Sequence, residues 1–400
     1  MERKYRRTLY ASYIGYITQA IVNNLAPLLF VVFQREFQIS LGQIGFLVTY
    51  NFAVQITVDF LAANFAEKIG YKKCVVAAHI FSAAGLIGLG VFPGLLPSPY
   101  AGLLLAITVY AIGGGLIEVL VSPIVEALPT DGKSAAMSLL HSFYCWGHAM
   151  VVILSTVFFA LAGTENWRLL TALWAIIPLG NAFLYAASPV LVLKGEGGSL
   201  SMSKLVMLKQ FWLLVLLMIC SGASEQAMSQ WSSYFAETGL QVSKTMGDLL
   251  GPCLFAILMG LSRWFYGSKG NAIPLRKFIV CSAALCVVSY LAAVFSPLPV
   301  LSLIACGICG LSVGIMWPGV FSMSTEYCPQ GGTVMFGLLA LAGDVGCASG
   351  PSVVGFISDA MGGQLKAGLL VAILFPIALM VGVWALNKQK SKRACCKIVS

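Results

Sequence analysis

The stretch GGGLIEVLVSPIVEAL, residues 113–128, places one carboxylate, Glu118, inside an otherwise apolar run. An ionised side chain at membrane depth costs roughly 2.5–3.5 kcal/mol even on lenient insertion scales, so it normally faces a cavity or a partner. The three glycines allow a neighbouring helix or a ligand to approach closely, and Pro123 favours a bend. Two interpretations of Glu118 stay open: a functional carboxylate, or one that a partner neutralises for packing alone.

The composition of the whole chain is that of a membrane protein. Of the 400 residues, 59% are hydrophobic and only 10% are charged, whereas a soluble protein carries about 25% charged residues. Apolar runs of ~20 residues are long enough to cross a bilayer as helices. We therefore predict an all-α integral membrane protein with twelve transmembrane helices. They are expected at about 10–34, 41–65, 74–95, 99–126, 133–162, 167–192, 209–235, 246–267, 275–296, 299–324, 332–357 and 364–387.

The spans fall into two halves. A Gly- and Ser-rich segment, LKGEGGSLSMSKLVML at 193–208, lies midway along the chain. It predicts an N-terminal six-helix bundle (1–192), a cytoplasmic linker (193–208), a C-terminal six-helix bundle (209–387) and a basic cytoplasmic tail (388–400). Gly115-x7-Pro123 parallels Gly310-x7-Pro318, which indicates a weak internal repeat. Repeated halves are typical of transporters, whose site lies between them.

The basic residues predict the orientation. With both termini on one side, nineteen of the 24 Lys and Arg residues lie on that side. The positive-inside rule then places both termini in the cytoplasm. The net charge of +9 is explained by anionic headgroups, so no nucleic-acid partner is expected. We expect a monomer in the plasma membrane, specifically a bacterial inner membrane.

Polar side chains recur inside the spans, where each needs a partner. In the first span, Gln19 and Asn23 share a face and Asn24 adjoins them. In the second, Asn51, Gln55 and Asp59 recur every fourth residue, on a cavity or an inter-helix face. The remaining candidates for contact with a ligand are His141, Tyr144, Glu225, Trp231 and Trp317, and Asp344 is a further acid at lipid depth.

Cofactor and enzyme chemistry find little support in the sequence. The cysteines are dispersed through apolar spans, and the histidines lack a metalloprotease spacing. No phosphate loop or nucleophile–base pair is recognisable. We predict no metal, no cofactor and no catalytic residues.

The segment ANFAEKIGYKK, residues 63–73, resembles the signature between the second and third helices of the major facilitator superfamily, G-x-L-A-D-R-x-G-R-K. The match is degenerate, with Glu67 at the Asp position and Lys68 at the Arg position, while Gly70 and Lys72 keep their places. The resemblance implies that these residues form a conformational latch rather than a solute contact.

Three motifs resemble the fucose–galactose–glucose:proton symporter family, the fucose permease-like group. They are the NNL of 23–25, an acid followed by four residues and Pro in IEVLVSP, and LLHSFYCWG in the fifth span. The resemblance implies sugar uptake coupled to protons, with Glu118 as the family's proton-linked glutamate. The first-span aspartate of that family is Pro27 here, and its Gln and Asn positions are His141 and Tyr144.

The resulting prediction is a secondary active transporter that takes up a small polar solute, such as a monosaccharide, by alternating access and with a proton. Glu118, Asp59 and Asp344 are the candidates for proton coupling. Solute would bind at Gln19, Asn23, Asn24, His141, Tyr144, Glu225, Trp231 and Trp317. A proton-coupled efflux antiporter and an uncoupled facilitator remain alternatives, the former because 346–351 reads G-x-x-x-G-P.

Overall fold

The computed structural model describes residues 3–129, 133–191, 202–269, 273–328 and 332–399, and within them every regular element is helical. Twelve helical segments of this part of the chain are long and apolar enough to cross a membrane. The predicted all-α membrane architecture is therefore confirmed.

The N-terminal half contains two interrupted spans, the first and the sixth. The half consists of α1 (Arg3–Asn24), the 3₁₀ turn η1 (Ala26–Leu29), α2 (Phe30–Phe37), α3 (Leu41–Ile69), α4 (Tyr71–Leu95), α5 (Pro99–Glu126), α6 (Lys133–Ala162), η2 (Thr164–Asn166), α7 (Trp167–Trp174) and α8 (Ile176–Ala186). Pro27 lies in the interruption of the first span. Because proline has no N–H, it cannot continue the α-helical hydrogen bonding.

The C-terminal half contains two spans with π-helical turns. It consists of α9 (Met202–Leu205), α10 (Lys209–Ser229), α11 (Ser232–Tyr234), the π-helix η3 (Phe235–Gly239), α12 (Lys244–Asp248), the π-helix η4 (Leu249–Cys253), α13 (Leu254–Lys269), α14 (Leu275–Phe295), α15 (Pro299–Val313), α16 (Met316–Tyr327), α17 (Gly332–Ala360), α18 (Leu365–Ala372) and α19 (Leu374–Val399).

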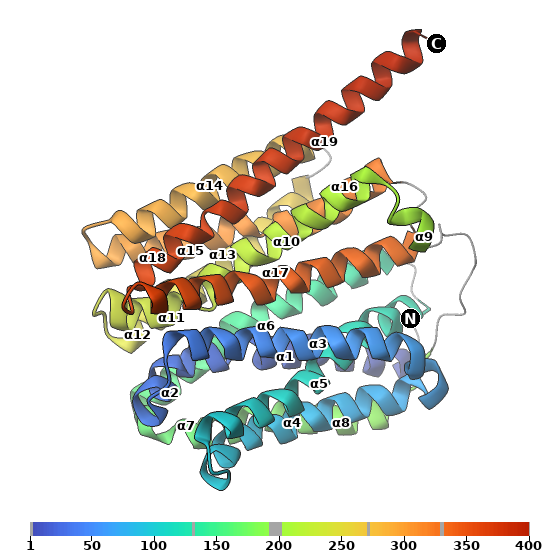
Figure 1. Cartoon of the computed structure of the whole chain (residues 1–400). Helices are drawn as coiled ribbons and strands as arrows, with labels where there is room; N and C mark the ends of the chain where they lie inside the picture. Colours follow the sequence, from blue (N-terminus) through green and yellow to red (C-terminus); the bar gives the residue numbers. More distant parts are fainter. Residues whose placement is uncertain (1–2, 130–132, 192–201, 270–272, 329–331, 400) are drawn as a thin grey trace.

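The two halves lie side by side as separate bundles, and both termini lie at the same end of the molecule (Figure 1). Helices α3 and α17 pack against each other across the boundary. There, a Cβ added to Gly45 would lie 3.3 Å from the Cα of Gly355. Large apolar side chains such as Leu161 and Phe183 remain exposed on the outside, as expected where lipid is the solvent.

Two predicted boundaries differ from the structure. The sixth span was expected to reach residue 192, but α8 ends at Ala186 because Pro189 disfavours the helical conformation before it. The last helix was expected to end near residue 387, whereas α19 continues through the basic tail to Val399, since Lys, Gln, Arg and Ala favour helix. Most of the predicted linker lies outside the described residues.

The glycines of the opening stretch let α5 approach three helices at once. A Cβ on Gly113 would lie 2.4 Å from the carbonyl oxygen of Ala78 in α4, and one on Gly115 would lie 2.9 Å from that of Gln55 in α3. Gly114 faces the side chain of Gln19 in α1, and a Cβ on Gly114 would lie 3.2 Å from Gln19 Oε1. The close approach predicted for these glycines is present, and it brings Glu118 to the centre of the bundle.

A severe restriction joins α10 and α17, where a Cβ on Gly346 would lie 2.1 Å from the carbonyl oxygen of Ile219. We expect Gly346→Ala to lower the free energy of unfolding by about 1–3 kcal/mol, because the helices must separate to admit the methyl group. Gly337→Ala on the same helix meets nothing within 4 Å and should gain up to about 1 kcal/mol from helix propensity. Unfolding in mixed detergent–SDS micelles measures both, and shifts of the same sign would contradict this account.

Candidate functional site

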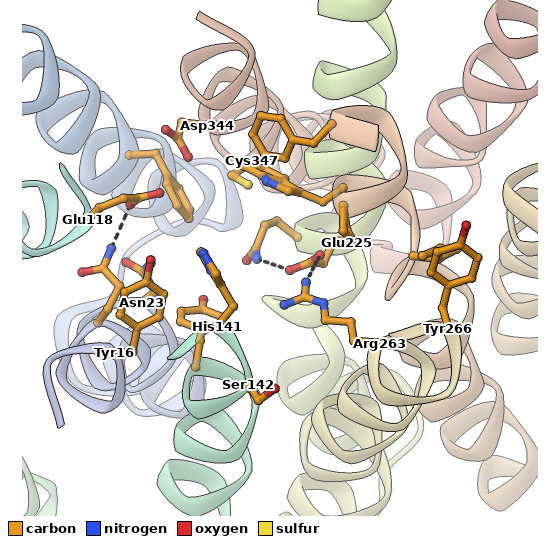
Figure 2. Close-up of a pocket in the computed structure, with 18 of the residues that line it drawn as sticks. Tyr16, Asn23, Glu118, His141, Ser142, Glu225, Arg263, Tyr266, Asp344 and Cys347 are labelled. Atoms are coloured by element: carbon orange, nitrogen blue, oxygen red, sulfur yellow. Dashed lines mark hydrogen bonds and ion pairs between the residues drawn. The ribbon is translucent and has the colours of Figure 1, made fainter. Parts of the chain in front are cut away.

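A cavity of about 750 Å³ lies between the two halves. Its lining comes from α1, α3, α5 and α6 on one side and from α10, α13, α16 and α17 on the other (Figure 2). The lining residues are Tyr16, Gln19, Asn23, Phe52, Glu118, His141, Ser142, Tyr144, Glu225, Gln226, Arg263, Trp264, Tyr266, Ile315, Trp317, Pro318, Phe321, Asp344 and Cys347.

Glu118 reaches this cavity as one partner of a buried amide cluster. The Nε2 of Gln19 donates to Glu118 Oε2 at 3.0 Å and to Gln55 Oε1 at 2.9 Å. Asn23 Oδ1 in turn accepts from Gln55 Nε2 at 2.9 Å and from Asn51 Nδ2 at 3.2 Å. The polar stripe of the second span therefore serves an inter-helix face. Its amides hold Gln19 and Asn23 at the cavity wall.

The amide cluster leaves hydrogen-bonding capacity unused. Gln19 Oε1 and Asn51 Oδ1 are buried with no hydrogen-bond partner within the described part of the chain. Buried polar atoms are normally paired, so such atoms call for an explanation. Both atoms are enclosed by the helices rather than exposed to the cavity, and Gln19 Oε1 lies against Gly114 of α5.

The other two predicted acids occupy different places. Asp344, in α17, lines the cavity from the C-terminal half, and it lies at the same end of the cavity as Glu118 (Figure 2). Asp59 is not part of the lining. It packs behind α5, where a Cβ on Gly115 would lie 3.0 Å from its Oδ1, and that oxygen has no described hydrogen-bond partner. Of the three acids, two face the cavity.

An ion pair between Glu225 and Arg263 forms the opposite wall. Arg263 Nη2 lies 3.5 Å from Glu225 Oε2, and its Nε donates to the carbonyl oxygen of Gly314 at 3.2 Å. Gln226 Nε2 donates to Glu225 Oε1 at 3.2 Å. Arg263 was not among the predicted site residues, although a lone basic residue inside an apolar span was a usable signal.

Of the aromatic candidates, some line the cavity and one does not. His141 is exposed to the cavity and meets Tyr16 edge to face, with ring centroids 5.1 Å apart. Trp317 also lines the cavity. Trp231 does not: it is 0% exposed, and its indole N–H donates to the carbonyl oxygen of Pro351 at 3.0 Å. The predicted contact of Trp231 with solute is therefore wrong for this arrangement, because the side chain packs the halves together.

Asn24 and the predicted latch lie away from the cavity. Asn24 Nδ2 donates to the carbonyl oxygen of Ala20 and, at 3.3 Å, to the hydroxyl of Tyr144, which does line the cavity. Gly70 joins α3 to α4 with a φ of 98°, a conformation that favours glycine. Lys68 and Lys72 are exposed there, and the side chain of Glu67 lies outside the described residues.

At the end away from the termini the halves meet directly, with a contact that depends on Pro27. A proline has no N–H, so the carbonyl oxygen of Asn23, four residues earlier, lacks its helical donor. Gln230 of the other half donates to that oxygen at 3.1 Å and to Gln226 Oε1 at 2.8 Å. The cavity is thus closed at this end, while its lining extends to Trp264, Tyr266 and Phe321 near the other.

Two helical bundles around a polar central cavity define a membrane transporter rather than an enzyme. The family model described as Major Facilitator Superfamily matches residues 12–351. The chain belongs to the Major Facilitator Superfamily.

The comparisons with individual proteins agree with this family. Membrane protein MosC of Rhizobium meliloti is 24% identical over 346 residues, which is 85% of this chain and 79% of that protein.

Among solved structures, a bacterial homologue of the human lysosomal transporter Spinster, inward-facing and unoccupied, has a TM-score of 0.78 at 15% identity over 97% of this chain and 98% of that one. The E. coli fucose:proton symporter FucP has a TM-score of 0.65 at 19% identity, covering 96% and 99%. The nucleoside transporter NupG has a TM-score of 0.73 at 15% identity, covering 95% and 98%. These structures share the fold.

Proposed function

We propose that this protein takes up a small polar solute, of the monosaccharide or polyol class, together with a proton. The observation that carries the proposal is that Glu118 of one half and Asp344 of the other line the same cavity. The first-span aspartate of the fucose permease-like group is Pro27 here, so Asp344 is the acid that takes its place as the second carboxyl group of the site.

The cavity walls fit a solute rich in hydroxyl groups. Small-molecule sites combine apolar and aromatic walls with a few well-placed polar groups. Here Gln19 and Asn23 supply amide groups, Arg263 supplies a cation, and Trp317 supplies an aromatic ring. A volume of about 750 Å³ also falls within the range of small-molecule sites. The similarity to FucP, a fucose:proton symporter, favours a sugar over other polar solutes.

Coupling follows from the cost of burying charge. While the cavity is open at one end, water solvates the carboxylates of Glu118 and Asp344. Closing the halves around them removes this water, which disfavours the charged form. A proton that binds first removes this cost, so the closed, solute-filled state is favoured when proton and solute are both bound. Release on the other side follows when water enters from that side.

Two alternatives use the same cavity. Replacement of the family aspartate by Pro27 favours an uncoupled facilitator. The apolar lining residues Phe52, Ile315 and Phe321 favour export of a lipophilic compound in exchange for protons. The direction and sign of the proton movement separate all three functions.

The test is solute-dependent pH change in proteoliposomes, measured across a panel of sugars, polyols, amino acids and lipophilic cations. We expect external alkalinisation with one solute class, retained in Asp359→Asn, whose exposed carboxylate on α17 lies outside the cavity lining. Solute flux without a pH signal would favour the facilitator. A pH response only to lipophilic cations would overturn uptake in favour of efflux.

A further inference from the structure

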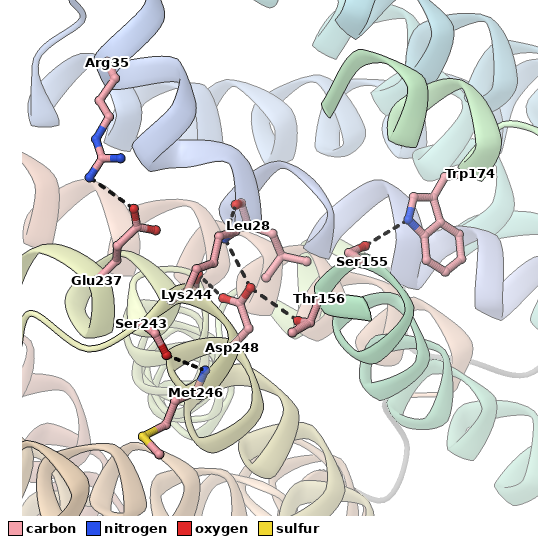
Figure 3. A network of polar contacts seen from close by, with 11 residues as sticks. Leu28, Arg35, Ser155, Thr156, Trp174, Glu237, Ser243, Lys244, Met246 and Asp248 are labelled. Carbon is pink, nitrogen blue, oxygen red and sulfur yellow. Dashed lines mark hydrogen bonds and ion pairs between the residues drawn. The ribbon is translucent and has the colours of Figure 1, made fainter. Parts of the chain in front are cut away.

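A second polar network lies outside the cavity, at the end away from the termini (Figure 3). Its centre is Asp248, the last residue of α12, which is 0% exposed. Lys244 Nζ lies 3.2 Å from Asp248 Oδ2, and the hydroxyl of Thr156 in α6 donates to the same oxygen at 3.3 Å. Ser233 in α11 donates to Asp248 Oδ1. One buried carboxylate is therefore held by groups from both halves.

Lys244 extends the network to the interrupted first span. Its Nζ donates to the carbonyl oxygen of Leu28, in η1, at 2.8 Å. The same ammonium group lies 5.2 Å from the centre of the Phe159 ring in α6, within the range of a cation–π contact. Leu28, Thr156 and Phe159 belong to the N-terminal half, and Lys244 and Asp248 to the C-terminal half. Separating the halves at this end would remove three contacts at once.

The backbone around the pair is unusual. The short helix α12 lies between two π-helical segments, η3 before it and η4 directly after it. π-Helical turns are rare and occur frequently at functional sites. π-Helical turns are also points at which helices kink, and here they interrupt the seventh and eighth spans on both sides of α12.

We infer that Lys244 and Asp248 are positioning residues that hold this end of the transport pathway closed. The ion pair is dry and fully compensated only while the halves touch. When they separate, water replaces the contacts of Thr156 and of the Leu28 carbonyl. The closure itself rests on the geometry, and its role in the transport cycle rests on the proposed function. Removing one partner leaves the other charge buried without compensation, which strongly disfavours the closed arrangement.

A nearby pair provides a matched control. Arg35 Nη2 lies 3.2 Å from Glu237 Oε1, and this pair also joins the two halves at the same end. The Arg35 side chain is 71% exposed, however, whereas that of Lys244 is 13% exposed. Exposed ion pairs contribute little. Glu237→Gln removes a charge and a contact between the halves, and the charge that it leaves behind, on Arg35, is exposed to water.

The experiment measures how readily this interface opens, in detergent micelles where both ends of the protein face the solution. A cysteine is introduced at Ser352, which is 8% exposed and contacts Thr49 of the other half. The rate at which a polar maleimide modifies this residue is followed by peptide mass spectrometry in the otherwise unchanged chain and in Lys244→Ala, Asp248→Asn, Lys244→Met/Asp248→Asn and Glu237→Gln. Cys286, Cys306 and Cys309, buried inside the C-terminal half, report unfolding.

We expect Lys244→Ala and Asp248→Asn to raise the modification rate at position 352 on the order of tenfold or more. The rate in the double variant should fall most of the way back to that of the unchanged chain, because neither charge is then left alone, and Glu237→Gln should change the rate by less than about fivefold. Unchanged rates in both single variants would overturn the inference. So would an equal rise at the three core cysteines, since the variants would then loosen the fold rather than open the interface. Because no solute is needed, these outcomes do not depend on the proposed substrate or coupling ion.

Discussion

Replacing Glu118 by Gln is expected to reduce solute-driven proton uptake to the level of protein-free liposomes while downhill solute flux continues. Gln has the shape of a protonated Glu, and its amide oxygen can still accept the hydrogen bond that Gln19 donates to Glu118 in the structure. The cavity of Glu118→Gln can therefore close around the solute without a proton. The measurement is external pH and solute accumulation, recorded in parallel in the same vesicles.

Three companion variants make this result specific. Glu118→Asp keeps a carboxyl group and should retain part of the proton signal. Asp344→Asn removes the acid of the opposite wall and should also uncouple transport if the two acids act together. Asp359→Asn, outside the cavity lining, should behave as the unchanged protein. Accumulation of solute against its gradient by Glu118→Gln would show that another group carries the proton.

Replacing Arg263 by Met is expected to cause the largest loss of stability among the site variants. The Glu225 side chain is 9% exposed, and Arg263 is the cation that lies beside it. Removing one partner of a buried ion pair costs about 3–5 kcal/mol. Equilibrium unfolding in mixed detergent–SDS micelles should show a loss of this order for Arg263→Met.

The double variant distinguishes the ion pair from mere loss of packing. Arg263→Met/Glu225→Gln removes both charges and should recover most of the lost free energy of unfolding, because no charge is left buried alone. Glu237→Gln, which leaves only the exposed Arg35, should change the free energy of unfolding by about 1 kcal/mol or less. If the double variant were as unstable as Arg263→Met, the shape of the arginine rather than its charge would be responsible.

Several of the predicted site residues, each a polar group that interrupts an apolar span, lie at the central cavity. Glu118, Gln19, Asn23, His141, Glu225 and Asp344 all line the cavity. Such a residue is costly against lipid, so its presence alone indicates a cavity or a partner. The same argument could not separate the two: Asp59 and Glu118 look equivalent in the sequence, yet Asp59 packs behind Gly115 and Glu118 faces the cavity.

The contacts between the two halves could not be predicted from the sequence. In the sequence, Lys244 lies just before the eighth predicted span, and Trp231 is a candidate for contact with solute. In the structure Lys244 donates to the carbonyl oxygen of Leu28, and Trp231 packs on Phe30 with ring centroids 5.6 Å apart. No periodicity relates residues so distant in the chain. Their meeting depends on how two separately predictable bundles dock.

The sequence by itself determined that the chain spans a membrane twelve times in two halves, because hydrocarbon accepts only long apolar helices whose backbone hydrogen bonds are internal. It also determined which side chains are too polar to face lipid. Only the tertiary structure decided which of them meet. Pairing Glu225 with Arg263, opposing Glu118 to Asp344 and burying Lys244 with Asp248 all depend on helix rotation and on the docking of the halves. Helix rotation and docking depend in turn on close packing at glycines such as Gly346 and on helix interruptions such as that at Pro27. The consequences of both features depend on residues that are far away in the chain.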